Sequence, residues 1–360
     1  MKAYRIFLII PGLFVALKCF SQGTTSKFSS VDSFVATVKY QGNLDSLTKR
    51  LTASYPDQLF KARAIFMWIT ENIGYNCAYY NRYDYKGREP RTYTCKDDKD
   101  CEAKKEDWET KYIDRVVKSK SAVCQGYSML FKRMCDIAGL KSNIIAGYTR
   151  TEYYQVGTPG SLNHTWNSIL IDSTYYLLDA TWAAGGCLKD EDGKLLFFAR
   201  DFDEYYWLTP YKDFARNHCP KDPVWTLIPN YTLETFASNP YYNPSEISQI
   251  KLILPGSGII NAKKGDTIHF KIAYRNEFKD LQINSNIFRN PDIWVKERIS
   301  KRKTIRRYDS LAVKQQQYVP YRRDGDLYEF EYVVTNTSLY FLDILCDKKR
   351  IMRFNVKVNE

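Results

Sequence analysis

The sequence is poor in the residues that usually hold metal ions. It contains three histidines in 360 residues, and its nine cysteines include no Cys-x-x-Cys pair. Protein zinc sites are normally built from such pairs or from clustered histidines. The sequence therefore predicts no metal site and no cofactor.

The sequence also lacks an apolar run long enough to span a membrane. Its one candidate, Ile6 to Phe20, is shorter than the roughly 20 apolar residues that a spanning helix needs and follows two basic residues. This layout is typical of a cleavable signal peptide, which we predict over residues 1–22. We therefore expect a secreted or periplasmic protein. The charged Lys18 beside Cys19 disfavours processing as a lipoprotein.

No internal repeat or low-complexity segment is visible, whereas hydrophobic residues make up 44% of the chain and aromatic residues 15%. This composition excludes a disordered or collagen-like chain. A length of 360 residues exceeds what one hydrophobic core usually serves. We therefore expect two domains, with a boundary near residue 245.

Residues 23–245 alternate between helical and strand patterns, which predicts an α+β domain. Apolar spacings of three and four residues predict helices at 43–53, 57–73 and Cys124 to Ala138. Short runs rich in Ile, Leu, Tyr and Trp predict strands at Ser142–Thr149, His164–Ile171 and Tyr175–Trp182. The last two are expected to form a β-hairpin. Residues 77–111 show no clear period and are expected to form a surface insertion.

Residues 246–360 show the short strand-like segments of a β-sandwich, here expected to be Ig-like. The predicted strands are Gly256–Ile260, Thr267–Tyr274, Asp326–Val334, Ser338–Cys346 and Ile351–Val358. This part also carries most of the positive charge. From Ser245 to Glu360, 22 Lys and Arg face 14 Asp and Glu, a net charge of +8.

The densest charge run is residues 296–307, KERISKRKTIRR, with seven basic residues and one acidic residue. Such a run usually forms a solvated hairpin. It could also dock an anionic envelope polymer or a membrane surface by electrostatic attraction. Export and the absence of a recognised binding motif disfavour nucleic acid as a partner.

Three residues have the positions that nucleophilic catalysis requires. Cys124 opens a predicted helix, where the positive end of the helix dipole favours a reactive thiolate. His164 begins one strand of the predicted hairpin and Asp179 ends the other, so antiparallel pairing brings imidazole and carboxylate together. A nucleophile, its base and a carboxylate that orients the base form a catalytic triad. His218 and His269 lack such a context, and we expect structural or exposed roles for them.

Four segments resemble the transglutaminase-like superfamily of papain-type Cys/His/Asp enzymes, in its kyphoscoliosis-peptidase-like branch. They are FKARAIFMWITENIGYN at 60–76, SAVCQGYSMLFKRMCDIAGL at 121–140, NHTWNSILIDSTYYLLDATWAAG at 163–185 and YYWLTPYKDFARNHCPKDPVWTLI at 205–228. The resemblance implies a papain-like catalytic domain. It assigns the nucleophile to Cys124, the general base to His164 and the orienting acid to Asp179.

The resemblance implies attack of a thiolate on an acyl carbonyl and an acyl-enzyme intermediate. Water would then give a peptidase or amidase acting on a protein or peptide, and an amine would give cross-linking by acyl transfer. The rival interpretation is a noncatalytic binding or scaffold protein that keeps the fold. Among the other cysteines, Cys95 and Cys101 lie close enough in a polar loop either to pair or to remain free, and Cys135 is expected to be free.

Overall fold

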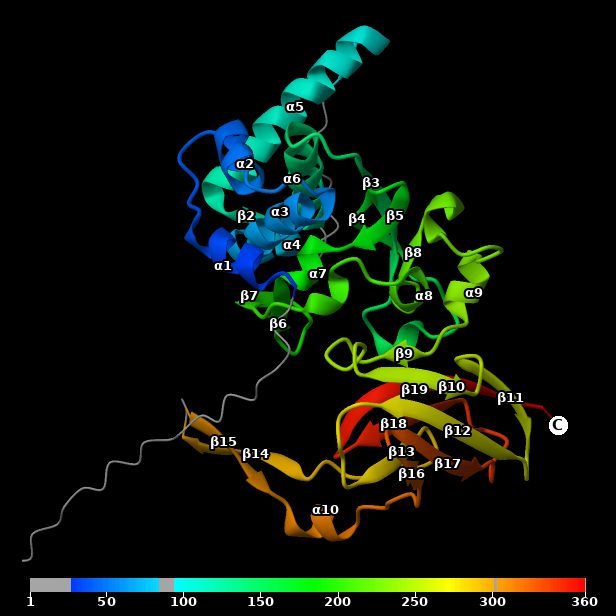
Figure 1. Ribbon diagram of the computed structural model, residues 1–360. Helices are drawn as coiled ribbons and strands as arrows, with labels where there is room; N and C mark the ends of the chain where they lie inside the picture. Colours follow the sequence, from blue (N-terminus) through cyan, green and yellow to red (C-terminus); the bar gives the residue numbers. More distant parts are fainter. Residues whose placement is uncertain (1–26, 84–93, 301–302, 360) are drawn as a thin grey trace, which may run out of the picture.

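The computed structural model describes residues 27–83, 94–300 and 303–359. The predicted signal peptide, residues 1–22, lies outside the described residues. Figure 1 shows a mixed helical and stranded N-terminal region above a C-terminal region built mainly of strands. Each region has its own hydrophobic cluster, one extending from Phe28 to Phe214 and the other from Tyr242 to Val356. Among the described residues, none of the helices is both long and apolar enough to cross a membrane.

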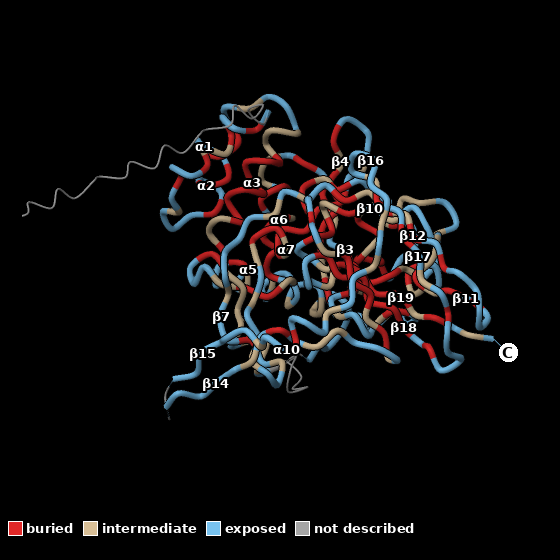
Figure 2. Tube along the Cα trace, turned by 90° about the horizontal axis from the view of Figure 1, so that it is seen from below, coloured by how far each residue is buried: buried red, intermediate tan, exposed pale blue. Residues whose placement is uncertain are grey.

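The N-terminal region begins with helices packed around α3 and α6. The helices are α1 (Ser29–Thr37), α2 (Leu44–Thr52), α3 (Gln58–Asn72), α4 (Cys77–Tyr83), α5 (Asp98–Ser119) and α6 (Cys124–Ile137). In Figure 2, α3 and α6 are largely buried. In α3 the buried residues form an unbroken run from Ala62 to Thr70. The two predicted helices at 43–53 and 57–73 correspond to α2 and α3.

A four-stranded antiparallel sheet lies against α6. Its strands are β3 (Ser142–Thr149), β4 (Leu162–Ile171), β5 (Thr174–Leu178) and β8 (His218–Pro220), in the order β5-β4-β3-β8. Two pairs of short strands accompany this sheet. They are β1 (Gly74–Tyr75) with β2 (Ser121–Ala122), and β6 (Gly185–Lys189) with β7 (Leu195–Arg200).

One local expectation for this region was wrong, and one segment contains helices that the sequence did not predict. The strand expected to reach Trp182 ends at Leu178, because the side chain of Asp179 caps a short helix, α7 (Ala180–Ala183). The described part of residues 77–111 contains α4 and most of the 22-residue α5, which begins behind the side-chain cap of Asp97. The sequence did not predict these helices, because residues 77–111 show no clear apolar period. Cys95 and Cys101 form a disulfide at the start of α5.

Short helical turns and strands lie between the longer elements of the N-terminal region or lead from its sheet to the C-terminal region. They are η1 (Tyr153–Gln155), η2 (Glu204–Tyr206), α8 (Tyr211–Phe214), η3 (Pro223–Thr226), α9 (Leu233–Ala237) and β9 (Tyr241–Tyr242). Strand β9 pairs with β19 of the C-terminal region, so this sheet begins on the N-terminal side of residue 245. Asn355 also donates a hydrogen bond to the carbonyl of Val156, at 2.7 Å.

The C-terminal region packs two sheets face to face. One contains β10 (Ile250–Leu254), β12 (Thr267–Tyr274), β17 (Leu327–Val333) and β16 (Arg322–Asp324). The other contains β11 (Ile259–Lys263), β19 (Lys349–Asn359), β18 (Phe341–Cys346) and β13 (Leu281–Ser285), with β9. Phe270 and Phe354 meet between the sheets with ring centroids 5.3 Å apart. The region is therefore a β-sandwich.

A hairpin leaves the sandwich and carries the basic segment. It consists of β14 (Trp294–Ser300) and β15 (Lys303–Tyr308), followed by the short helix α10 (Ser310–Lys314). Nearly all its described residues are exposed, and Figure 2 shows it projecting from the body of the protein. Lys296 on this hairpin reaches Glu191, in the turn between β6 and β7, at 2.7 Å.

Candidate active site

The thiol of Cys124 lies at the first turn of α6, and the segment that leads into this helix is closely packed. Strand β2 precedes it and is held by parallel pairing with β1. Gly126 lets α6 approach this strand, because a Cβ at that position would lie 2.7 Å from the Cβ of Ala122. Helix α6 begins at Cys124 itself, with Val123 as its N-cap. The backbone around the partly exposed Cys124 is thus fixed from both sides.

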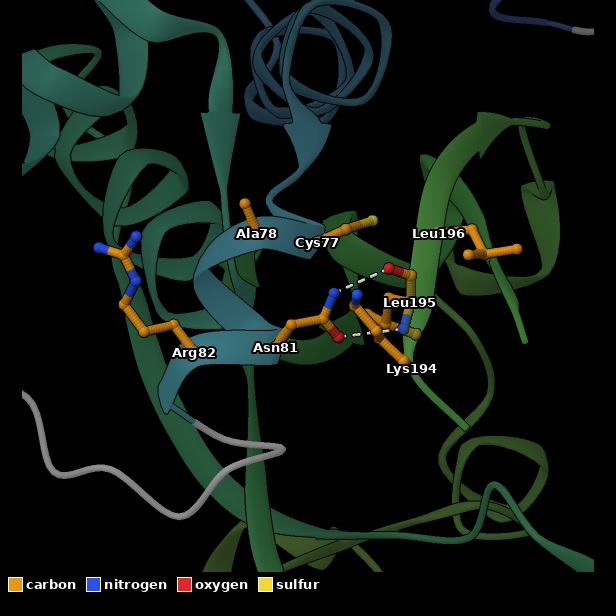
Figure 3. Close-up of a pocket in the computed structure, with 7 residues that line it drawn as sticks. All are labelled: Cys77, Ala78, Asn81, Arg82, Lys194, Leu195 and Leu196. Atoms are coloured by element: carbon orange, nitrogen blue, oxygen red, sulfur yellow. Dashed lines mark hydrogen bonds between the residues drawn. The ribbon is translucent and has the colours of Figure 1, made fainter. Parts of the chain in front are cut away.

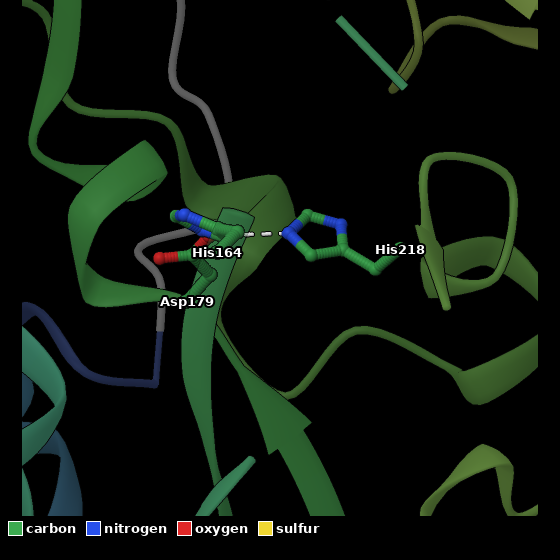
Figure 4. Close-up of side chains that lie close together, drawn as sticks. All are labelled: His164, Asp179 and His218. Atoms are coloured by element: carbon green, nitrogen blue, oxygen red, sulfur yellow. Dashed lines mark hydrogen bonds and ion pairs between the residues drawn. The ribbon is translucent and has the colours of Figure 1, made fainter. Parts of the chain in front are cut away.

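His164 and Asp179 come from the two strands of the β4–β5 hairpin. Asn167 pairs with Leu178, so the residue after β5 lies near the start of β4. His164 Nε2 is 2.6 Å from Asp179 Oδ2, and both side chains are buried (Figure 4). Asparagine side-chain hydrogen bonds tie the hairpin to α6, since Asn167 Nδ2 donates to the carbonyl of Ser128 at 3.1 Å. The sheet therefore holds the imidazole beside the helix that carries Cys124.

Cys124 and His164 lie close enough for each to shift the pKa of the other. Because His164 Nε2 contacts Asp179, Nδ1 is the ring nitrogen that remains to interact with the thiol. Burial raises the pKa of the Cys124 thiol, but the hydrogen bond and charge of His164 and hydrogen bonds from Thr165 outweigh it and lower that pKa below its usual 9.0. Burial opposes the charged form of His164, but Asp179 and Cys124 together raise the imidazole pKa to about 10. These opposite shifts favour a thiolate and imidazolium pair.

Asp179 remains ionised although it is fully buried. Its Oδ1 accepts backbone N–H groups from Thr181 at 2.8 Å and Trp182 at 3.2 Å, at the start of α7. Burial raises the pKa of the carboxyl, but the charges and hydrogen bonds of His164 and His218 hold that pKa well below its usual range. Hydrogen bonds to the charged form have this effect. The same cap that ends β5 therefore keeps the carboxylate charged and aimed at His164.

His218 joins this group, which the sequence interpretation did not anticipate. It opens β8, and its Nε2 lies 3.1 Å from Asp179 Oδ2 (Figure 4). The cue in the sequence was weak, because His218 lies in an irregular Asn-His-Cys-Pro stretch 39 residues from Asp179. Thr165, next to His164, is a second residue that the sequence interpretation missed.

His164, Asp179 and His218 place possible metal-ligand atoms within 4.8 Å of one another. The two imidazole nitrogens, however, bond directly to the same carboxylate oxygen, at 2.6 and 3.1 Å. A zinc ion would need about 2.0–2.2 Å to each ligand, and so would have to displace these contacts. The arrangement fits a hydrogen-bonded acid–base group better than a metal centre.

The remaining candidate residues lie apart from this group. His269, on β12, is exposed, and its Nδ1 lies 2.9 Å from Glu331 Oε1. Cys135 is buried in α6, and burial raises the pKa of its thiol well above the usual value. The expected exposed role of His269 and the free state of Cys135 agree with the structure.

Comparison with known proteins identifies the class. The profile of the transglutaminase-like superfamily matches residues 45–180, a span that includes Cys124, His164 and Asp179 and ends before His218. Residues 45–180 thus belong to the transglutaminase-like superfamily. Human kyphoscoliosis peptidase is 26% identical over 219 residues, which are 60% of this chain and 29% of that protein. The domain falls in the kyphoscoliosis-peptidase-like branch of the superfamily.

Two further similarities are more distant. Hillarin of Drosophila melanogaster is 24% identical over 228 residues, covering 60% of this chain and 25% of that protein. A crystal structure of a TGase is 15% identical, with a TM-score of 0.25, and covers 45% of this chain and 34% of that chain. The chain spans less than a third of the length of these curated relatives.

Proposed function

We propose that this protein is a cysteine hydrolase of peptide or amide bonds. The observation that carries the proposal is the arrangement of Cys124, His164 and Asp179, in which His164 Nε2 lies 2.6 Å from Asp179 Oδ2 and the thiol and the imidazole shift each other's pKa. Its opposite pKa shifts favour a nucleophilic thiolate beside a proton donor. The name of the kyphoscoliosis peptidases supports a peptidase over other members of the superfamily.

The reaction begins with attack of the Cys124 thiolate on the substrate's acyl carbonyl. The backbone N–H of Cys124, at the start of α6, is a natural donor to the oxyanion that develops. The His164 imidazolium gives its proton to the leaving amine, leaving an acyl-enzyme thioester. His164 then takes a proton from water, whose attack releases the acid and restores the thiolate.

Two proposals concern where the protein works. The predicted signal peptide at residues 1–22 supports a secreted or periplasmic location. The β14–β15 hairpin supports an electrostatic dock for an anionic envelope polymer or membrane surface, since the described basic residues of its two strands are exposed.

A peptide carrying a thiol-directed acyl electrophile tests the chemistry. We expect it to label Cys124 faster than any other thiol at neutral pH, as mapped by mass spectrometry. Cys124→Ala should abolish labelling at position 124. It should also reduce hydrolysis of a mixture of substrate peptides by roughly 10⁴-fold or more. His269→Gln, far from the site, is the matched control and should behave as the wild type.

The outcomes distinguish the alternatives. Release of free acid from the labelled or acylated protein supports hydrolysis. Transfer of the acyl group to an added primary amine, with little hydrolysis, would replace the hydrolase by an acyltransferase. A correctly folded protein in which Cys124 reacts no faster than ordinary thiols would favour the noncatalytic scaffold and reject both.

A further inference from the structure

His218 gives Asp179 a second imidazole donor from the far edge of the sheet. His164 Nε2 and His218 Nε2 approach the same oxygen, Asp179 Oδ2, at 2.6 and 3.1 Å. His218 opens β8, which pairs with β3, and β3 pairs with β4. The donor therefore reaches Asp179 across strands that are not neighbours of β5.

The surroundings of His218 leave its ring little freedom. The imidazole is only 1% exposed. It stacks on Phe214 with centroids 4.2 Å apart and lies 4.5 Å from the Trp182 ring and 5.0 Å from the Trp166 ring. Four neighbouring contacts thus determine where Nε2 points, since Asn217 Oδ1 lies 2.7 Å from His218 Nδ1 on the opposite side.

Counting protons fixes the role of each nitrogen. An ionised Asp179 can only accept, so the Nε2 atoms of both histidines carry protons. Burial and the charge of His164 lower the pKa of His218 to about 4 against the attraction of Asp179, so His218 is neutral at neutral pH and its Nδ1 is bare. A bare Nδ1 needs a donor, which Asn217 supplies once its amide is turned by 180°. The amide oxygen then accepts from the hydroxyl of Tyr206, 3.1 Å away.

We propose that His218 is a positioning residue for the catalytic pair: its neutral ring donates Nε2–H to Asp179 Oδ2 and holds that carboxylate ionised and directed at His164. The inference rests on the proposed cysteine chemistry, but the donor itself exists whether or not a substrate is turned over. No bond forms or breaks at His218. Its effect on Cys124 passes through Asp179 and His164.

Two variants distinguish the effect of the His218 N–H donor from that of the packing of its ring. His218→Leu removes the donor, whereas His218→Gln keeps an N–H group that can reach Asp179. The measurement is the rate of Cys124 alkylation by iodoacetamide from pH 4 to 10. In the Leu variant we expect the apparent pKa of Cys124 to rise and the rate at pH 6 to fall by about 10- to 100-fold, the usual effect of losing a hydrogen bond to a charged group. The Gln variant should recover most of this loss.

Unfolded chains alkylate as ordinary thiols, so the rates are measured on the folded fraction of each variant, isolated by size-exclusion chromatography and checked by circular dichroism. His269→Gln should keep the wild-type profile. A wild-type profile in both His218 variants would overturn the proposal. So would equal impairment of the Leu and Gln variants, because the ring's packing rather than its N–H would then matter. A wild-type Cys124 with ordinary reactivity would instead count against the proposed function.

A spectroscopic measurement needs no variant to fold. The chain has three histidines, so long-range ¹H–¹⁵N correlations of the ¹⁵N-labelled full-length protein give three separable imidazole patterns. We expect His218 to be the Nε2–H tautomer at pH 7. His269→Gln removes the exposed histidine and so assists assignment. An Nε2 without its proton would overturn the proposal, even if Cys124 proves reactive.

An independent observation points to a second disulfide. The sulfur atoms of Cys77, at the start of α4, and Cys187, on β6, lie 3.6 Å apart. Helix α4 is also tied to β7, the partner strand of β6, since Asn81 exchanges hydrogen bonds of 2.8 and 3.0 Å with the backbone of Leu195 (Figure 3). Lysine and arginine side chains, Arg82 among them, share a cavity of about 440 Å³ with Cys77.

We infer that Cys77 and Cys187 are a site of disulfide formation. Two thiols lose two protons and two electrons, and one sulfur–sulfur bond forms. Glutathione disulfide takes the electrons and protons and becomes two molecules of glutathione. The bond would brace two segments that flank the site, because α4 follows β1, which pairs with the strand before Cys124, and β6 follows the helix that Asp179 caps.

Refolding in a glutathione redox buffer, alkylation and non-reducing peptide mapping test this inference. We expect a peptide that joins Cys77 to Cys187, and the Cys95–Cys101 disulfide serves as an internal control. Cys77→Ser and Cys187→Ser should each lower the oxidised protein's melting temperature by the same amount, and the difference should vanish in dithiothreitol. Full alkylation of both thiols while Cys95 and Cys101 remain paired would overturn the inference.

Discussion

Each region of the protein buries an aspartate, and the two are held in different ways. Asp179, in the N-terminal region, accepts from two imidazoles and two backbone N–H groups. Asp343, on β18, meets Arg353 through two contacts of 2.5 and 2.7 Å and Arg350 at 3.0 Å. Both are almost completely buried.

The difference lies in the partners' chemistry. Arginine stays protonated at all accessible pH values, so the ion pair of Asp343 has one charge state and no proton to move. Histidine can change its charge, and one of the two histidines that contact Asp179 also interacts with the thiol of Cys124. Burial alone therefore does not identify an active carboxylate. A buried carboxylate whose partner can pass a proton to a nucleophile does.

The sharpest test exchanges each aspartate for its neutral isostere. Asp179→Asn should slow turnover by about 10⁴-fold, because an amide at this position favours the wrong imidazole tautomer in a triad. Asp343→Asn should leave the Cys124 labelling rate unchanged. Rates measured with the acyl electrophile, together with circular dichroism of both variants, check the contrast.

A large loss of labelling in folded Asp343→Asn would break the comparison, since it would couple the sandwich to the site. Unchanged labelling in Asp179→Asn would show that the carboxylate is structural in both regions.

The second test addresses stability. Arg353→Met removes the bidentate partner and leaves Asp343 buried with only the single contact of Arg350. Removing one member of a buried pair typically costs about 3–5 kcal/mol, because the remaining charge is uncompensated. Urea unfolding should show a loss of this size, while Cys124 labelling in the folded protein stays at the wild-type rate. The double variant Arg353→Met with Asp343→Leu should recover much of the stability, and failure to recover any would contradict this account.

Sequence reasoning located the parts of the site that short-range structure creates. A helix start placed Cys124, and a three-residue turn between two short strands placed His164 near Asp179. Strand β3 has the bounds that its residue pattern predicted, Ser142–Thr149. His218 was missed because its approach depends on the pairing of β8 with β3, whose partners are about 70 residues apart. Local periodicity contains no information about such a pairing.

The same reasoning failed where one side chain decides local structure. Asp179 ends β5 by capping α7, a choice that the surrounding Tyr, Leu and Trp residues concealed because they favour strand. In α5 the sequence is mostly charged, and only Ile113, Val116 and Val117 are buried. A helix with so narrow an apolar stripe gives little periodic signal. For this reason the sequence did not predict α5 within the expected surface insertion.

The third test uses pH to distinguish the two aspartates, in proteins that carry Cys124→Ala so that the thiol does not titrate. The pKa of Asp179 lies below its ordinary 3.8, so its stabilising effect is present above pH 3.8 and is lost as pH falls below it. Without the thiol, Asp179 still raises the pKa of His164 above its ordinary 6.5, so its effect is full below pH 6.5 and is lost as pH rises through the raised pKa.

The unfolding free energy that Asp179→Asn removes should therefore be largest between about pH 3.8 and 6.5 and smaller at pH 9. For Asp343→Asn the loss should be the same at pH 5.5 and 9, because Arg353 stays charged. Urea titrations at these two pH values measure both differences. A loss for Asp179→Asn that does not change between them would contradict the raised pKa of His164.

The smallest effect is expected where charges are exposed rather than buried. On the β14–β15 hairpin, Lys303, Arg306 and Arg307 lie in solvent, where salt screens charges over about 8 Å at physiological ionic strength. Changing all three to Gln should leave the melting temperature and Cys124 labelling unchanged. It should weaken co-sedimentation with anionic lipid vesicles or binding to an anionic polysaccharide at low salt, and added salt should weaken the wild type in the same way. Equal binding by the wild type and the triple variant would contradict the proposed electrostatic dock and favour a solvated hairpin.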